Sequence, residues 1–166
     1  MSTIGSGRIV ATTLVEGCAD AATLVLQEPL SFWGGLDATS GQIIERRHPQ
    51  CGSSISNRIL VMRAGRGSSS GSSVLAEAIR LGTGPAGIVM LSRDAIVTVG
   101  AMVAAELYRR ECPVVLVKAD DWGRIAKAAS LSITAQADRA EILTQERQVH
   151  VTPGAAQRLL KPPACA

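Results

Sequence analysis

The chain has 166 residues, of which 46% are hydrophobic, 19% are charged and 2% are aromatic. That length can bury one well-packed core but is short for two ordinary domains, so we expect one compact domain. Its 17 basic and 14 acidic residues give a formal net charge of +3. Because the sequence has no cationic tract and few aromatic side chains that could stack on bases, it gives no indication of nucleic-acid binding.

The cysteine spacing argues against a zinc site and against a disulfide framework. No Cys-x-x-Cys pair occurs among Cys18, Cys51, Cys112 and Cys165, so we expect reduced thiols and no metal held by this chain. The first eight residues lack the charged and apolar parts of a signal peptide. The longest apolar run, 95–107, is shorter than the roughly 20 residues of a membrane-spanning helix. We therefore expect a cytoplasmic protein that does not enter membranes.

The first third of the chain has strand patterns followed by a long irregular stretch. Residues 8–15 and 22–27 are rich in β-branched side chains, and residues 16–20 between them have turn composition. A hairpin or two neighbouring strands are expected there. Glycine, serine, proline and aspartate accumulate over residues 29–57, which is typical of a segment that carries function or covers an interface.

From residue 59 onward, strand and helix patterns alternate, which predicts parallel strands with crossover helices. The expected elements are strand 59–62, helix 71–81, strand 87–91, helix 95–109, strand 113–118, a short helix near 122–129, and a hairpin of 131–136 with 140–143. Because the first and last strand pairs have no helices between them, we expect an α/β fold with a mixed sheet or small barrel and two or three helices on one side. Residues 1–148 would form this domain, and residues 149–166 a loosely attached tail.

The segment from Gly65 to Ser73 is the most informative about function, because it is rich in glycine and serine and lies between an expected strand and an expected helix. Glycines let the backbone turn tightly and let another molecule approach it closely. Serines at a helix start add hydroxyls beside unpaired N–H groups. Together with the helix dipole, these groups would form a pocket for a carboxylate or another anion.

Two nearby motifs resemble known functional patterns. Residues 82–87 match the letters of the dinucleotide-binding fingerprint but follow a helix and lead into a strand, so they are expected to stop the helix and turn the chain. Residues 67–71 satisfy the nucleophile-elbow pattern of serine hydrolases. In that alternative Ser69 is the nucleophile, and His150 with Asp120 or Asp121 completes a triad. The small domain and the place of His150 in the expected tail weigh against it.

Some single residues also carry expectations. Three methionines lie in apolar runs and are expected in the core: Met62, Met90 and Met102. His48, which follows two arginines, is expected to be exposed or to cap an element, with a polar active-site contact as the alternative. Trp33, beside paired glycines, is expected at a packed corner or at the wall of a pocket.

Several segments, in order along the chain, resemble the small subunit of aconitase X. They are PLSFWGGLD (29–37), GQII (41–44), His48 with GSSI (52–55), GRGSSSGS (65–72) and GPAGIV (84–89), and the resemblance covers most of residues 5–145. It implies a swivelling β/β/α barrel-like domain, like the aconitase swivel domain, that closes over a larger subunit. It also implies that the large subunit, and not this chain, ligates an iron site or iron–sulfur cluster.

The resemblance assigns roles within the loop as well. In aconitases the swivel domain contributes a Gly-x-Gly-Ser-Ser-Arg loop, whose first serine is the base that removes a proton next to a carboxylate. The similar segment here puts Ser68 in the position of the base. It implies substrate-binding roles for Arg66, Gly67, Ser69, Ser70 and Gly71. Ser70 stands where the aconitase loop has arginine, which fits a different or smaller substrate, and Arg66 is expected to compensate in part.

The family includes two activities, dehydration of cis-3-hydroxy-L-proline in bacteria and of mevalonate 5-phosphate in archaea. The alanine-rich composition and the residues beyond 145 favour the first. A phosphorylated substrate would also need more cationic side chains around it than Arg66 alone provides, unless the large subunit supplies them. We expect the small subunit of a metal-dependent hydro-lyase that acts on a small hydroxy acid only with its large subunit. A stand-alone barrel that binds a partner and does no chemistry is the alternative outside catalysis.

Overall fold

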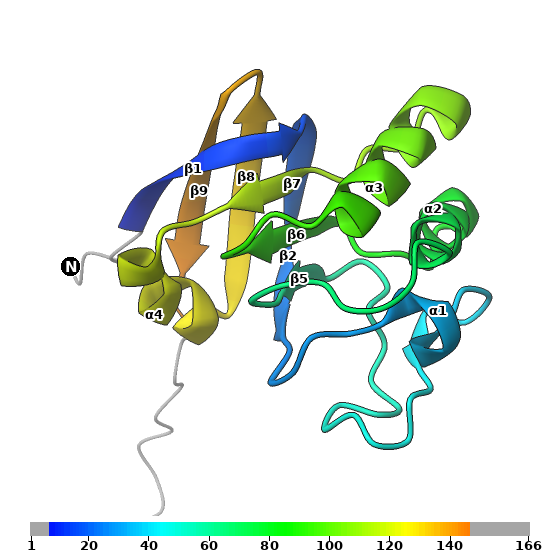
Figure 1. The fold of residues 1–166 in the computed structure, drawn as a ribbon. Coiled ribbons are helices and arrows are strands. Elements are labelled where there is room, and N and C mark those ends of the chain that lie inside the picture. The colour runs from blue at the N-terminus through cyan, green and yellow to red at the C-terminus, as the bar shows by residue number, and fades with distance from the viewer. Residues whose placement is uncertain (1–6, 147–166) are drawn as a thin grey trace, which may run out of the picture.

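Strands from both halves of the chain close into a seven-stranded barrel, with helices packed outside it (Figure 1). The computed structural model describes residues 7–146, so the expected tail, with His150 and Cys165, lies outside the described residues. The elements are β1 (Gly7–Val15), β2 (Gly17–Val25), α1 (Phe32–Gly35), β3 (Leu36–Asp37), β4 (Gln42–Ile43), β5 (Ile59–Val61), α2 (Gly71–Leu81), β6 (Gly87–Met90), α3 (Ala95–Tyr108), β7 (Val114–Leu116), α4 (Ala119–Lys127), β8 (Ser130–Gln136) and β9 (Arg139–Gln145).

The barrel has the strand order β1-β7-β6-β5-β2-β8-β9, and β9 pairs with β1 to close it. Strands β2, β5, β6 and β7 run parallel to their neighbours within this group, and the remaining pairs are antiparallel. Helices α2 and α3 form the crossovers between the parallel strands. The predicted α/β fold with a small mixed barrel and crossover helices is therefore confirmed.

The expectation that the first two strands form a hairpin or lie side by side is wrong. Strand β1 pairs with β7 and β9, whereas β2 pairs with β5 and β8. The chain turns sharply at Gly17, whose φ of +144° is a conformation that favours glycine, and β2 begins there. Both strands find their partners in distant parts of the sequence, which local turn composition does not encode.

The core has two layers because β5 is buried on both faces. Successive side chains of a strand point to opposite faces, so Ile59 and Val61 pack inside the barrel while Leu60 packs toward the helices. Barrel-interior partners include Val89, Val115, Leu131, Ile133 and Ile142. The helix-side layer includes Leu75, Ile79, Ile88, Met90 and Val97. Apolar side chains on both faces explain why β5 to β7 read as continuous hydrophobic runs.

Helices α2 and α3 lie together on one side of the barrel, and α4 lies at another corner (Figure 1). Gly82 adopts the left-handed conformation that ends α2, which confirms the expected helix stop at residues 82–87.

Met62 and Met90 are buried in the core, as expected. The expectation that Met102 also lies in the core is wrong, since 49% of this residue is exposed on the outer face of α3. Within residues 7–146, no helix is both long enough and apolar enough to span a bilayer.

The connecting segment, residues 26–58 between β2 and β5, contains α1 and the β3–β4 pair and packs beside α2. Its apolar side chains Leu30, Phe32, Leu36, Ile43 and Ile55 join the helix-side core. His48 is 3% exposed, so the expectation of an exposed histidine is wrong. Its Nε2 lies 3.1 Å from the Glu28 carbonyl oxygen, and its Nδ1 accepts the Gln50 N–H at 3.1 Å. His48 therefore stabilises the fold of this segment.

Candidate functional site

The serine loop, residues 65–70, lies at the carboxyl ends of the parallel strands. It follows β5, and the segments that follow β6 and β7 emerge at the same edge of the barrel, because β5, β6 and β7 are parallel neighbours. In open α/β sheets and in β/α barrels, ligands bind outside the carboxyl ends of the parallel strands. The structure thus puts the sequence's most informative segment at the place where such folds bind ligands.

The loop can approach its neighbours only because it contains glycines. Gly67 has a φ of +108°, and a Cβ atom built on it would lie 3.0 Å from Cβ of Ser31 and would overlap the Ser31 hydroxyl. A Cβ atom on Gly65 would collide with the Asp94 carboxylate. That carboxylate caps α3 by accepting the Val97 N–H at 2.9 Å. Ser31 and Asp94 therefore fix the path of the loop, and sequence reasoning found neither.

Ser68 is exposed, and its hydroxyl already has one donor. Its Oγ accepts the backbone N–H of Ser70 at 3.1 Å, and its carbonyl oxygen accepts the N–H of Gly71 at 2.9 Å. Ser70 is the N-cap of α2, so the hydroxyl lies at the positive end of an eleven-residue helix. A backbone N–H and a helix N-terminus both favour negative charge on an oxygen. The surroundings of the Ser68 hydroxyl therefore favour negative charge on its oxygen, and its role as a base stays a prediction.

The other predicted loop residues have different surroundings. Ser69 and Ser70 are exposed, and the Ser69 carbonyl oxygen accepts both the N–H and the hydroxyl of Ser72, at 3.1 Å and 2.7 Å. Gly71 is buried, and a Cβ atom there would lie 3.2 Å from the Ile96 side chain. The structure gives Gly71 a packing role, while substrate binding by Gly67, Ser69, Ser70 and Gly71 stays a prediction.

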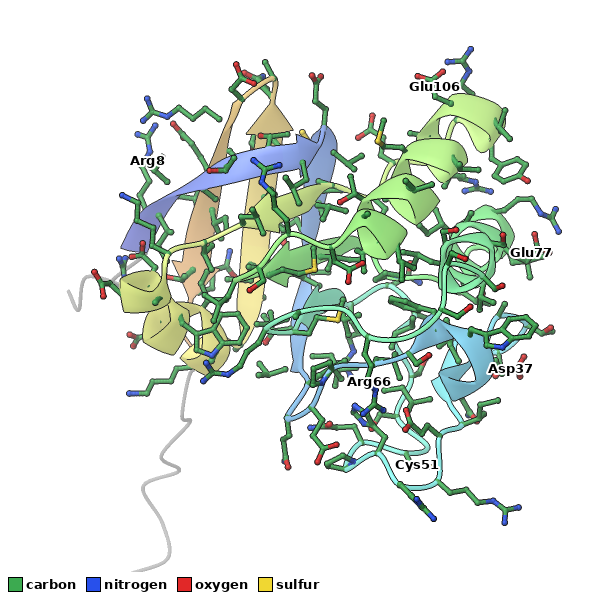
Figure 2. All side chains as sticks on the ribbon, in the orientation of Figure 1. Arg8, Asp37, Cys51, Arg66, Glu77 and Glu106 are labelled. Carbon is green, nitrogen blue, oxygen red and sulfur yellow. The ribbon has the colours of Figure 1, made fainter. Side chains whose placement is uncertain are left out.

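Arg66 forms an ion pair that the sequence did not predict. Its Nη2 donates to Oε1 of Glu45 at 2.5 Å, and the two side chains are 43% and 29% exposed. An isolated bridge between Ser31 and Arg66 joins the same two segments through the backbone. Figure 2 shows Arg66 at the junction of the serine loop and the connecting segment, apart from Glu77 and Glu106 on the outer helices. The sequence gives little indication of this pair, because Arg46 and Arg47 follow Glu45 directly and are nearer to it along the chain than Arg66 is.

Trp33 lies on the connecting segment and is 60% exposed, so it is not packed at a corner within this chain. The hydroxyl of the neighbouring Ser31 donates to the Trp33 carbonyl oxygen at 2.9 Å and holds the turn that presents the indole. A single exposed apolar side chain is common on a protein surface, so the exposure of Trp33 does not by itself mark a binding site. Its expected role as a pocket wall stays a prediction.

The nucleophile-elbow alternative gains no support from the described residues. An elbow places its serine on a strained turn, yet the loop residue with positive φ is Gly67 and not Ser69. Asp121 pairs with Arg124 at 3.4 Å, and His150 lies outside the described residues. His48 is engaged by backbone groups on both ring nitrogens. No triad forms around Ser69 within residues 7–146.

The part of the chain from Gly7 to Glu146 contains no group of three or more His, Cys, Asp or Glu side chains that could hold a metal ion. Cys18, Cys51 and Cys112 are free thiols. Burial raises the pKa of the Cys112 thiol to about 12, so this sulfur stays protonated and is a poor metal ligand. These residues do not fit an iron site of their own.

Comparison with known proteins identifies the family. The sequence model described as the aconitase X swivel domain matches residues 8–142. This chain belongs to the aconitase X swivel domain family. The crystal structure of Thermococcus kodakaraensis aconitase X in its holo-form superimposes on this swivel domain with a TM-score of 0.67 and 26% sequence identity, covering 82% of this chain and 98% of that chain. The resemblance noted in the sequence is confirmed.

Relatives of the swivel domain differ in length. A Pseudomonas aeruginosa protein named cis-3-hydroxy-L-proline dehydratase is 42% identical over 125 residues, which are 71% of this chain but 22% of that protein. The chain thus spans about a fifth of that relative. A Pyrococcus furiosus protein named phosphomevalonate dehydratase small subunit is 31% identical over 132 residues, which are 80% of this chain and 92% of that protein.

Proposed function

We propose that this chain is the small subunit of a metal-dependent hydro-lyase, active only with an aconitase X large subunit, and that Ser68 is its catalytic base. The observation that carries the proposal is the geometry of Ser68: an exposed hydroxyl that accepts the Ser70 N–H at 3.1 Å at the start of α2. Family membership supports the reaction class, since relatives that match the chain are named dehydratases.

The exposure of Ser68 explains why a partner is needed. A neutral serine hydroxyl is a weak base, and in water its strongly basic alkoxide is scarcely populated. When a partner covers the loop and excludes water, the Ser70 N–H and the dipole of α2 stabilise the alkoxide more strongly. The covered Ser68 alkoxide would then take the proton from the carbon next to the substrate carboxylate and become the alcohol. The electron pair of that C–H bond would form the carbon–carbon double bond while the C–O bond on the adjacent carbon breaks. The leaving hydroxide would depart as water once the Ser68 hydroxyl returns the proton to it, which restores the alkoxide.

Arg66 is the cationic side chain that the loop offers to the substrate. After it donates through Nη2 to Glu45, its guanidinium keeps further N–H donors, and 43% of the side chain is exposed. We assign it to the substrate carboxylate. The backbone of Gly67 and the hydroxyls of Ser69 and Ser70 would line the same contact, and Gly71 would keep the helix start close to it.

The metal in this proposal is held by the large subunit. The described residues contain no ligand set for it. An iron centre bound there would act as a Lewis acid toward the leaving hydroxyl. The contribution of the swivel domain is the base, the carboxylate contact and the exclusion of water.

We assign cis-3-hydroxy-L-proline as the substrate, supported by the 42% identity to the Pseudomonas aeruginosa dehydratase over 125 residues. Mevalonate 5-phosphate is the second candidate, and a specific observation favours it. The Pyrococcus furiosus small subunit matches this chain over 92% of its own length, so a separate swivel chain of this size is the arrangement that relative has. Serine hydrolysis through Ser69 is the third reading.

Expression of this chain with the aconitase X large subunit of the same organism tests the proposal. Either cis-3-hydroxy-L-proline or mevalonate 5-phosphate is added to the mixture of the two chains and to each chain alone. Formation of the dehydrated product is then measured. We expect dehydration of cis-3-hydroxy-L-proline by the mixture only. Dehydration of mevalonate 5-phosphate instead would change the substrate but keep the reaction class. Labelling of Ser69 by a fluorophosphonate in the single chain would favour the hydrolase.

A further inference from the structure

Glu45 has a contact and a burial pattern that its surroundings do not explain. Its Oε1 accepts from Arg66 at 2.5 Å, across the junction between the connecting segment and the serine loop. Its Oε2 is buried and has no hydrogen-bond partner among the described residues. A Cβ atom on Gly35 would lie 3.4 Å from Oε2, so this oxygen faces the backbone of the Trp33–Gly35 corner.

This arrangement is a poor device for stability alone. A partly exposed ion pair contributes little to stability, because water already solvates both charges well. Burying a carboxylate oxygen without a donor is unfavourable and opposes that gain. A buried polar atom without a partner in a native structure calls for an explanation, and a role in orienting Arg66 would supply one.

The consequence of the pair is a fixed guanidinium. An arginine has five N–H donors in a planar group, and the contact with Glu45 uses one of them, on Nη2. The backbone bridge between Ser31 and Arg66 holds the start of the same side chain. The side chain is thus held near both ends, two residues before Ser68 in the loop, and its remaining N–H donors are left for another partner.

We propose that Glu45 is a positioning residue, which orients the Arg66 guanidinium so that its free donors receive the carboxylate of the substrate while Ser68 removes the neighbouring proton. This inference rests on the proposed function. Glu45 touches neither the substrate nor the reacting atoms; it acts through Arg66. Because Glu45 also cancels the charge of Arg66, its removal should increase the attraction of the loop for an anion while it loosens the orientation.

The test separates these two effects in the complex of this chain with its large subunit. For Glu45→Gln we expect kcat to fall at least about tenfold, since misorientation of a substrate contact is costly, while KM stays unchanged or decreases. In the double variant Glu45→Gln with Arg66→Gln, kcat/KM should equal that of Arg66→Gln alone, because the two residues act as one unit. Glu77→Gln is the matched control: Glu77 also pairs with an arginine, at 2.7 Å, but on the outer face of α2.

A second readout does not depend on turnover. In the isolated full chain labelled with ¹⁵N, the Arg66 Nη2–H resonances should be protected from exchange with water in the wild type and in Glu77→Gln, and lose protection in Glu45→Gln. Unchanged kcat and unchanged protection in Glu45→Gln would overturn the inference, as would a purely multiplicative loss in the double variant. A complex that dehydrates neither hydroxy acid would instead defeat the proposed function.

Discussion

The backbone of Gly100 in α3 lies directly against the carbonyl oxygen of Ser72 in the first turn of α2. A Cβ atom on Gly100 would stand 2.8 Å from that oxygen and 3.1 Å from the Leu75 side chain. Contacts this short are possible only where the residue has no side chain. Helix α2, which begins directly after the serine loop, thus packs closely against α3, and its position depends on the absence of a side chain at Gly100.

Substitution of Gly100 by alanine is expected to destabilise the protein by about 1–3 kcal/mol, because the added methyl group must push α3 away from a rigid backbone carbonyl. Gly123 is the matched control, since it lies inside α4 and has no atom within 4 Å of its would-be Cβ. Gly123→Ala should stabilise by about 0.5–1 kcal/mol through helix propensity. Urea unfolding of both variants checks this, and equal shifts of the same sign would contradict it.

Gly67→Ala is expected to distort the serine loop. The substitution adds the cost of a positive φ, about 1–3 kcal/mol, and a collision with Ser31. We predict at least about a tenfold loss of kcat in the assembled enzyme, since the loop can no longer orient Ser68. Gly52→Ala carries the backbone cost alone, at a φ of +86° with no atom nearby, and should keep its activity.

Addition of Ser31→Gly to Gly67→Ala tests the collision itself. If the Ser31 side chain is the obstacle, the double variant should recover part of the lost turnover, while its stability stays below that of the wild type. No recovery would mean that the positive φ alone accounts for the loss at position 67.

The thiol of Cys112 is expected to resist alkylation in the folded protein. Burial raises its pKa from its usual 9.0 to about 12, so no thiolate is available at pH 8. Cys18 and Cys51 are exposed and should react with iodoacetamide under native conditions. Peptide mapping by mass spectrometry in native buffer and in urea checks this. Native alkylation of Cys112 at the rate of Cys51 would contradict the burial.

The same shift of the Cys112 pKa gives a dependence of stability on pH. The folded chain binds the thiol proton more tightly than the unfolded chain does, so this contribution to stability is complete below pH 9 and is lost as the pH rises toward about 12. Urea midpoints measured between pH 8 and pH 11 should decrease, and a Cys112→Ala variant should show a smaller decrease. An equal slope in both proteins would rule out this cause.

Local patterns in the sequence were sufficient for α2, α3 and the serine loop and approximately for α4, whereas α1 lies in the segment that was expected to be irregular. The bounds of α2, residues 71–81, follow from a serine-rich start and from Gly82, which can adopt the left-handed conformation at the end. The loop itself was predicted because a strand, a glycine-rich turn and a helix follow one another directly. Ser68 and Arg66 were named from that segment and from the family resemblance.

Tertiary contacts account for what the sequence did not reveal. Strand β1 pairs with β7, about a hundred residues later in the sequence. The turn residues that follow β1 carry no information about that distant pairing. His48 is buried because the Glu28 carbonyl and the Gln50 N–H accommodate both ring nitrogens. Glu45 meets Arg66 across 21 positions of sequence, and no periodic pattern marks such a pair.

The direct test of the base is Ser68→Ala in the complex with the large subunit, compared with Ser73→Ala, a nearby exposed serine on α2. Loss of a general base typically costs about 10²–10⁴-fold in rate. We predict that kcat for dehydration falls by at least about a hundredfold in Ser68→Ala, with complex formation and thermal stability retained, and that Ser73→Ala stays near the wild type. Turnover of Ser68→Ala within a factor of about two of the wild type would show that this hydroxyl is not the base.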